Sequence, residues 1–176
     1  MDTSNQRPLR LPSRAAREQA ERKALWNEAR SPNNANFYTF GYAGRTANEL
    51  VGLAKSVGVR SIVDIRLNPI SMYKPDLSKT NFRRIVETAG LLYLHLPKLG
   101  VPRHIRARAI STGSRQTIWD WYESRVIPSF RKNLDWFFNI AEHPLAFMCV
   151  ETDPGECHRH LLFNALEEQG LQGFDL

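Results

Sequence analysis

Residues 37–65 read FYTFGYAGRTANELVGLAKSVGVRSIVDI, and this stretch predicts a strand, a helix and a second strand. Its aromatic-rich beginning ends in a glycine-containing turn, which is typical of a strand. Thr46 and Glu49 form a capping box, and apolar residues then recur at helical spacing up to Gly58. The apolar run 59–65 predicts a strand that is buried on both faces. The stretch therefore indicates a βαβ unit.

The same alternation continues along the chain. Further strands are expected at 91–96, 145–150 and 170–176, and further helices around 82–89, 119–126, 128–141 and 161–166. Strands that alternate with helices pair in parallel through right-handed crossovers. We therefore expect residues 37–176 to form an α/β domain, a Rossmann-like three-layer fold with a mostly parallel sheet of four to five strands.

Residues 1–36 differ from this domain in composition, because they carry an excess of basic residues and few large apolar ones. Ser13 could cap a helix that runs to about Arg30, and Ser31 and Pro32 then begin a linker. We expect a basic N-terminal extension and linker. A frayed extension or a helix packed on the domain is favoured over a basic arm that binds a polyanion.

Length and composition exclude several classes of protein. A chain of 176 residues fits one domain with a short appendage. Its longest tight apolar run, 145–150, is far shorter than the roughly 20 residues that span a bilayer. Cys149 and Cys157 are the two cysteines of the chain and cannot form a disulfide framework. We expect a cytoplasmic protein that has no membrane partner.

The charge of the chain permits an anionic partner. The formal net charge is +6, and the segment from Lys98 to Arg108 contains basic residues and no acid. Such an excess is compatible with binding a nucleotide or another small anion, and nucleic acid is a further candidate. Alternatively, these charges form only a solvated face.

Polar and glycine residues follow the expected strands at the points where the strands end. They are Tyr42, Gly44 and Arg45 after the first strand, Asp64 and Arg66 at the second, His95 at the third, and Glu151, Cys157, His158 and Arg159 after the fourth. In open parallel sheets, ligands bind outside the carboxyl ends of the strands. The sequence therefore predicts one pocket at this edge.

Four short blocks at these strand ends resemble the domain of unknown function 488 family. They are GYAGR (41–45), DIRLNP (64–69), HLPKLG (95–100) and a closing block that runs from CVE (149–151) through Pro154 to CHR (157–159). The resemblance covers about residues 37–176 and implies a Rossmann-like domain. It implies no established reaction.

Asp64 closes an apolar strand, where an unpaired carboxylate would be costly. It is interpreted either as a general base or as one member of an ion pair with Arg66 or Arg45. Both arginines could bind a phosphate or carboxylate through their planar forks. They could equally neutralise Asp64 and Glu151.

Cys157, His158 and Arg159 open the last expected helix, where backbone N–H groups favour an anion. The same position lowers the pKa of a cysteine, so Cys157 could be a nucleophile, although a buried packing role is favoured. His158 could act as an acid or base, or could only hydrogen-bond at the helix end. Arg159 is the expected anion ligand of the three.

The sequence indicates no metal and no cofactor. Possible zinc ligands are Cys149, Cys157, His158 and His160. The two cysteines are not separated by the two intervening residues that are common between the cysteine ligands of a zinc site.

We expect a hydrolase that acts on a nucleotide or nucleic-acid-like substrate at a glycosidic or phosphate ester bond. Asp64 and Glu151 would act as base and acid, with His158 as a further catalytic candidate. The expected substrate-binding residues are Tyr42, Gly44, Arg45, Arg66, His95, Cys157 and Arg159. The alternative is a non-catalytic module that binds a nucleotide or anion and acts through a partner.

Overall fold

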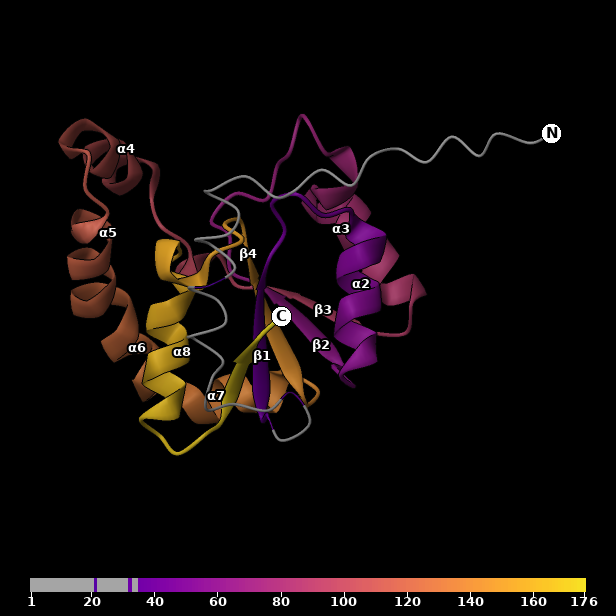
Figure 1. Cartoon of the computed structure of the whole chain (residues 1–176). Coiled ribbons are helices and arrows are strands. Elements are labelled where there is room, and N and C mark those ends of the chain that lie inside the picture. The colour runs from indigo at the N-terminus through magenta and orange to yellow at the C-terminus, as the bar shows by residue number, and fades with distance from the viewer. Residues whose placement is uncertain (1–20, 22–31, 33–34) are drawn as a thin grey trace.

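The computed structural model describes residues 21, 32 and 35–176. The expected N-terminal helix and linker lie outside the described residues, except for Glu21, Pro32 and the end of the linker. The described strands are β1 (Phe37–Gly41), β2 (Ser61–Asp64), β3 (Leu92–His95), β4 (Leu145–Cys149) and β5 (Gly173–Asp175). They form one sheet in the order β3-β2-β4-β1-β5, and every pair of neighbours is parallel (Figure 1). The α/β fold expected from the sequence is confirmed.

The described helices connect these strands. They are α2 (Ala47–Ser56), α3 (Lys79–Thr88), α4 (Arg103–Thr112), α5 (Gln116–Trp121), α6 (Ile127–Lys132), α7 (Leu134–Ile140) and α8 (Arg159–Glu167), with a π-helical turn at Tyr122–Val126 and 3-10 turns at Pro75–Leu77, Pro97–Leu99 and Pro154–Glu156. The sequence did not predict α4, because Ala109 is the one buried residue on it and there is no apolar stripe to detect. Within the described part of the chain, no helix combines the length and the apolar character needed to cross a bilayer.

The capping box places the start of α2 as predicted. The Thr46 hydroxyl accepts a hydrogen bond from the Glu49 N–H, and the Glu49 carboxylate accepts one from the Thr46 N–H at 2.7 Å. These two bonds satisfy donors that a helix leaves free at its first turn.

Helices cover both faces of the sheet. α2 and α3 lie on one side, whereas α4, α5, α6 and α8 lie on the other (Figure 1). Along β4, Phe147 and Cys149 pack toward α8, while Ala146 and Met148 pack toward α2 and α3. Both faces of the strands are therefore buried, as is typical of a parallel sheet.

Candidate functional site

A cavity of about 630 Å³ lies at the carboxyl edge of the sheet, between the strand ends and the α4–α5 segment. We call it the edge cavity. Its lining residues are Tyr42, Arg66, Leu67, Asn68, Ile70, Val101, Arg106, Ala109, Ile110, Gly113, Ser114, Arg115, Ile118, Cys149, Val150, Glu151 and His158. Segments distant in sequence therefore converge at the edge where open parallel sheets bind ligands.

Asp64 lies behind the edge cavity and holds Arg66 in place. Its carboxylate is fully buried and accepts hydrogen bonds from Arg66 Nε at 2.9 Å and Arg66 Nη2 at 2.6 Å. The Arg66 N–H donates a third bond at 3.1 Å, and the Tyr93 hydroxyl donates a fourth at 2.7 Å. Asp64 itself does not line the cavity, and it affects the cavity only by holding the side chain of Arg66 in position.

Arg66 is a fixed cation in the wall of the edge cavity. Burial alone would lower the pKa of its guanidinium, but the hydrogen bonds and charge of Asp64 outweigh this effect and raise the pKa. Its Cζ atom lies 5.0 Å from the centre of the Tyr42 ring, and its carbonyl oxygen lies 2.8 Å from His95 Nε2. Tyr42 and His95 thus support Arg66 from two directions.

Tyr93 was not recognised as a site residue, because an aromatic residue in a strand has the pattern of core. We expect Tyr93→Phe to lower the free energy of unfolding by about 1.5–3 kcal/mol, because Asp64 loses a hydrogen bond to a charged group. Chemical denaturation measures this change. Tyr73→Phe is the matched control, since Tyr73 is 99% exposed and should tolerate the change. Equal stability of the two variants would contradict this account of Asp64.

Glu151 follows β4 and enters the edge cavity with one third of its side chain exposed (33%). Its Oε1 lies 3.7 Å from Arg115 Nη1. Burial raises the pKa of Glu151 to about 7, and Cys157 adds to this rise.

The backbone at Glu151 is tightly packed against the end of β1, since a Cβ at Gly41 would lie 1.7 Å from the Glu151 carbonyl oxygen. This contact explains why glycine stands at the end of β1.

Five of the predicted substrate-binding residues do not line the edge cavity: Gly44, Arg45, His95, Cys157 and Arg159. Arg159 is fully buried, and its Nε and Nη2 atoms each lie 3.1 Å from Asp175 Oδ1. Arg45 donates a hydrogen bond from Nη1 to the Leu176 carbonyl at 3.2 Å. Gly44 lies between β1 and α2 with a φ of +78°, a conformation that favours glycine. Arg159, Arg45 and Gly44 support the fold around the cavity.

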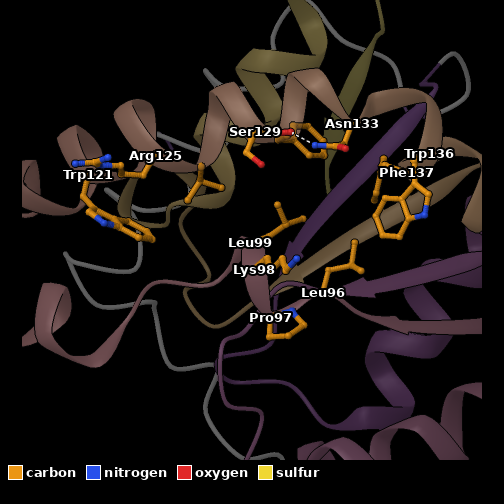
Figure 2. Close-up of a pocket in the computed structure, with 12 residues that line it drawn as sticks. Leu96, Pro97, Lys98, Leu99, Trp121, Arg125, Ser129, Asn133, Trp136 and Phe137 are labelled. Atoms are coloured by element: carbon orange, nitrogen blue, oxygen red, sulfur yellow. Dashed lines mark hydrogen bonds between the residues drawn. The ribbon is translucent and has the colours of Figure 1, made fainter.

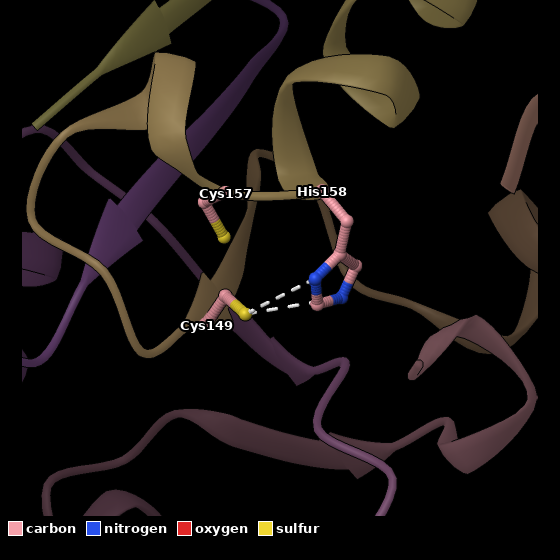
Figure 3. Close-up of side chains that lie close together, drawn as sticks. All are labelled: Cys149, Cys157 and His158. Atoms are coloured by element: carbon pink, nitrogen blue, oxygen red, sulfur yellow. Dashed lines mark hydrogen bonds between the residues drawn. The ribbon is translucent and has the colours of Figure 1, made fainter. Parts of the chain in front are cut away.

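The thiol–imidazole cluster comprises Cys149, Cys157 and His158 (Figure 3). Cys149 and His158 line the edge cavity, whereas Cys157 is fully buried and does not. Burial would raise the pKa of the Cys157 thiol, but hydrogen bonds from Cys149 and His158 and nearby positive charge hold it well below its ordinary value. The hydrogen bond to Cys157 and burial raise the pKa of Cys149 well above its usual range.

Two arginines enter the edge cavity from the α4–α5 segment. Arg106 comes from the basic segment that was singled out in the sequence, whereas Lys98 of the same segment lines a different cavity. Arg115 was not predicted as a site residue. It lies between α4 and α5, and the sequence did not predict α4. It also pairs with Glu156, at 2.8 Å between Nε and Oε2.

A second cavity of about 630 Å³ opens beside β3 and is lined largely by aromatic and aliphatic side chains, among them Trp121, Trp136 and Phe137 (Figure 2). Asn133 on its rim donates a hydrogen bond to the Ser129 carbonyl at 2.7 Å. Among the described residues that line it, none carries a carboxylate. Its chemistry therefore makes it a weaker candidate than the edge cavity.

No curated protein and no solved structure matches the chain. A family described as "Domain of unknown function DUF488" matches residues 46–166, about two thirds of the sequence. The match contains the ends of β2, β3 and β4 and the start of α8, and thus most of the edge cavity. The chain therefore belongs to the DUF488 family.

Proposed function

We propose that the protein is a hydrolase that binds a nucleotide or nucleic-acid-like substrate in the edge cavity. The observation that carries the proposal is that Arg66, Arg106 and Arg115 line one cavity together with a single carboxylate, that of Glu151. Among the described residues that line the cavity, no other side chain is acidic. The site thus combines cations for an anion with one carboxyl group that transfers protons.

The arginines suit phosphate because each guanidinium can present two parallel N–H donors to its oxygens. Asp64 already holds Arg66 rigidly, so little side-chain freedom is lost when an anion binds. Apolar residues of α4 and α5, including Ile110 and Ile118, offer a surface for a base ring. The cavity volume lies within the range of about 300–1,000 Å³ that small-molecule sites occupy.

Glu151 would supply the acid–base chemistry. Its carboxylate accepts the proton of the attacking water as the oxygen of that water bonds to the substrate. The bond to the leaving group breaks, and the protonated carboxyl returns the proton to the leaving group. General acid–base catalysis of this kind contributes typically about 10²–10⁴-fold to a rate.

The first test measures binding with a matched pair of variants on α4. Arg106 lines the edge cavity, whereas Arg108 is exposed on the same helix outside it. We expect Arg106→Ala to weaken nucleotide binding about tenfold, the loss of one charge-assisted contact of about 1.5 kcal/mol, and Arg108→Ala to leave binding unchanged. Calorimetric titration with nucleoside monophosphates, nucleoside diphosphates and single-stranded RNA oligonucleotides measures the effect.

The salt dependence of binding identifies the class of substrate. A single-stranded polymer should lose affinity steeply, with log K falling by about 0.7 per neutralised phosphate against log salt, whereas a mononucleotide should show a shallow slope. The proposal fails if neither nucleotides nor oligonucleotides bind at low salt. Binding without any release of base or phosphate would support the alternative, a non-catalytic anion-binding module.

A further inference from the structure

We propose that Cys149, Cys157 and His158 bind one thiophilic divalent metal ion, with Zn²⁺ as the preferred ion. This site goes beyond the proposed hydrolysis, which assigns no role to the two thiols. The ligand atoms of the three residues all lie within 4.8 Å of one another (Figure 3). Among the residues that the structure describes, no other group of histidine, cysteine and acidic side chains converges in this way.

The spacing of the ligand atoms is close to that of a tetrahedral zinc site. Bonds of about 2.3 Å to sulfur and about 2.0 Å to nitrogen place two ligand atoms roughly 3.5–3.8 Å apart. Cys149 Sγ lies 3.8 Å from both Nδ1 and Nε2 of His158. Either nitrogen is therefore within reach. Because the ligand atoms of all three residues lie within 4.8 Å of one another, a contraction of up to about 1 Å completes the coordination.

The fold brings these ligands together from two elements. Cys149 is the last residue of β4, and the turn Pro154–Glu156 delivers Cys157 and His158 to the start of α8. That turn is held by its own bonds, since Asp153 Oδ1 accepts from the Gly155 N–H at 2.8 Å and the Cys157 N–H donates to the Pro154 carbonyl at 3.1 Å. The positions of the ligands thus exist before any metal binds.

The charge and type of the ligands also favour this ion. Two thiolates, a neutral imidazole and a divalent cation sum to zero net charge, which suits the burial of Cys149 and Cys157. Thiolate and imidazole ligands select zinc and related soft ions over magnesium and calcium.

The fourth coordination position faces the edge cavity. Cys149 and His158 line that cavity, whereas Cys157 lies behind them. Glu151 Oε2 lies 3.8 Å from Cys149 Sγ, on the cavity side. Three protein ligands and one position open to a cavity is the arrangement of catalytic rather than structural zinc sites.

Titration of the reduced, metal-free full-length protein with Zn²⁺ and Co²⁺ tests the site. We expect one ion per chain, and a thiolate-to-Co²⁺ charge-transfer band together with the visible bands of tetrahedral cobalt. Cys149→Ser and Cys157→Ser should each weaken binding at least 100-fold, and at saturating Co²⁺ the band should fall to about half because one thiolate remains. His104→Gln is the matched histidine control, because His104 is exposed on α4 and should leave binding unchanged.

X-ray absorption on the zinc-loaded wild-type protein adds a measurement that does not depend on how the variants fold. We expect two sulfur and at least one nitrogen neighbour around zinc. The proposal is overturned if no ion binds stoichiometrically, or if the bound ion has no sulfur neighbours. It is also overturned if the reduced thiols form a disulfide in air while metal never binds. Because no substrate is needed, the result is independent of whether the protein is a hydrolase.

Discussion

Arg159→Met is expected to lower the free energy of unfolding by about 3–5 kcal/mol, the cost of removing one partner of a buried ion pair. Both Arg159 and Asp175 are fully buried in the structure. The substitution leaves the Asp175 carboxylate buried, with the Thr39 hydroxyl still donating to it at 2.5 Å. The hydrogen bond from this hydroxyl stabilises the carboxylate charge much less than the guanidinium of Arg159 does. Urea denaturation followed by circular dichroism measures the loss.

A surface ion pair supplies the control for this prediction. Arg131 pairs with Glu168, and both side chains are substantially exposed. Arg131→Met should therefore change the stability by less than about 1 kcal/mol. The double variant Arg159→Met/Asp175→Leu should be less destabilised than the sum of the two single variants, because it removes both buried charges. A wild-type stability for Arg159→Met would show that the pair does not hold the fold.

Glu151→Gln is expected to reduce turnover by about 10²–10⁴-fold, which is the usual contribution of a general acid or base. The amide has the shape of the carboxyl and can still form hydrogen bonds, but it does not carry a proton between water and the leaving group. Nucleotide binding should persist, because the arginines that contact the anion are unchanged. Chromatographic detection of released base and phosphate gives the rate, and calorimetry gives the affinity.

Glu156→Gln is the matched control for this experiment. Glu156 pairs with Arg115 at 2.8 Å, as Glu151 does more loosely, but it does not line the edge cavity. We expect Glu156→Gln to retain turnover. Full activity in Glu151→Gln would remove this residue from the mechanism. An equal loss in both variants would point to the placement of Arg115 instead.

Arg159 and Glu151, the residues changed in these two predictions, are connected through the backbone of residues 151 and 152. Arg159 donates hydrogen bonds to the carbonyl oxygens of Glu151 and Thr152, the latter at 2.9 Å. Arg159, which was expected to bind an anion, therefore positions the loop that carries Glu151, the proposed acid–base group. We expect it to influence activity through this loop.

The order of strands and helices could be predicted from the sequence because it depends on local patterns. The capping box at Thr46, the apolar strand 59–65 and the glycines that follow α2, α3 and α8 act within a few residues of the chain. Parallel pairing follows from the alternation and brings the carboxyl ends of the strands to one edge of the sheet. The order of the strands, in which β2 lies beside β4, was not predicted. The expectation of a candidate site at this edge thus follows from the sequence itself.

Only the tertiary structure determines which partners the charged and thiol side chains contact. Arg66 follows β2 and Arg159 begins α8, and both carry a guanidinium, yet Arg66 borders the cavity and Arg159 is buried against Asp175. The side chains of Cys149 and His158 lie within 3.8 Å of each other although eight residues separate them in the sequence. That sequence spacing does not predict a metal site. Such choices depend on distances of a few ångströms between separate elements. Local periodicity encodes the elements but does not contain those distances, which arise only when the sheet and α8 pack together.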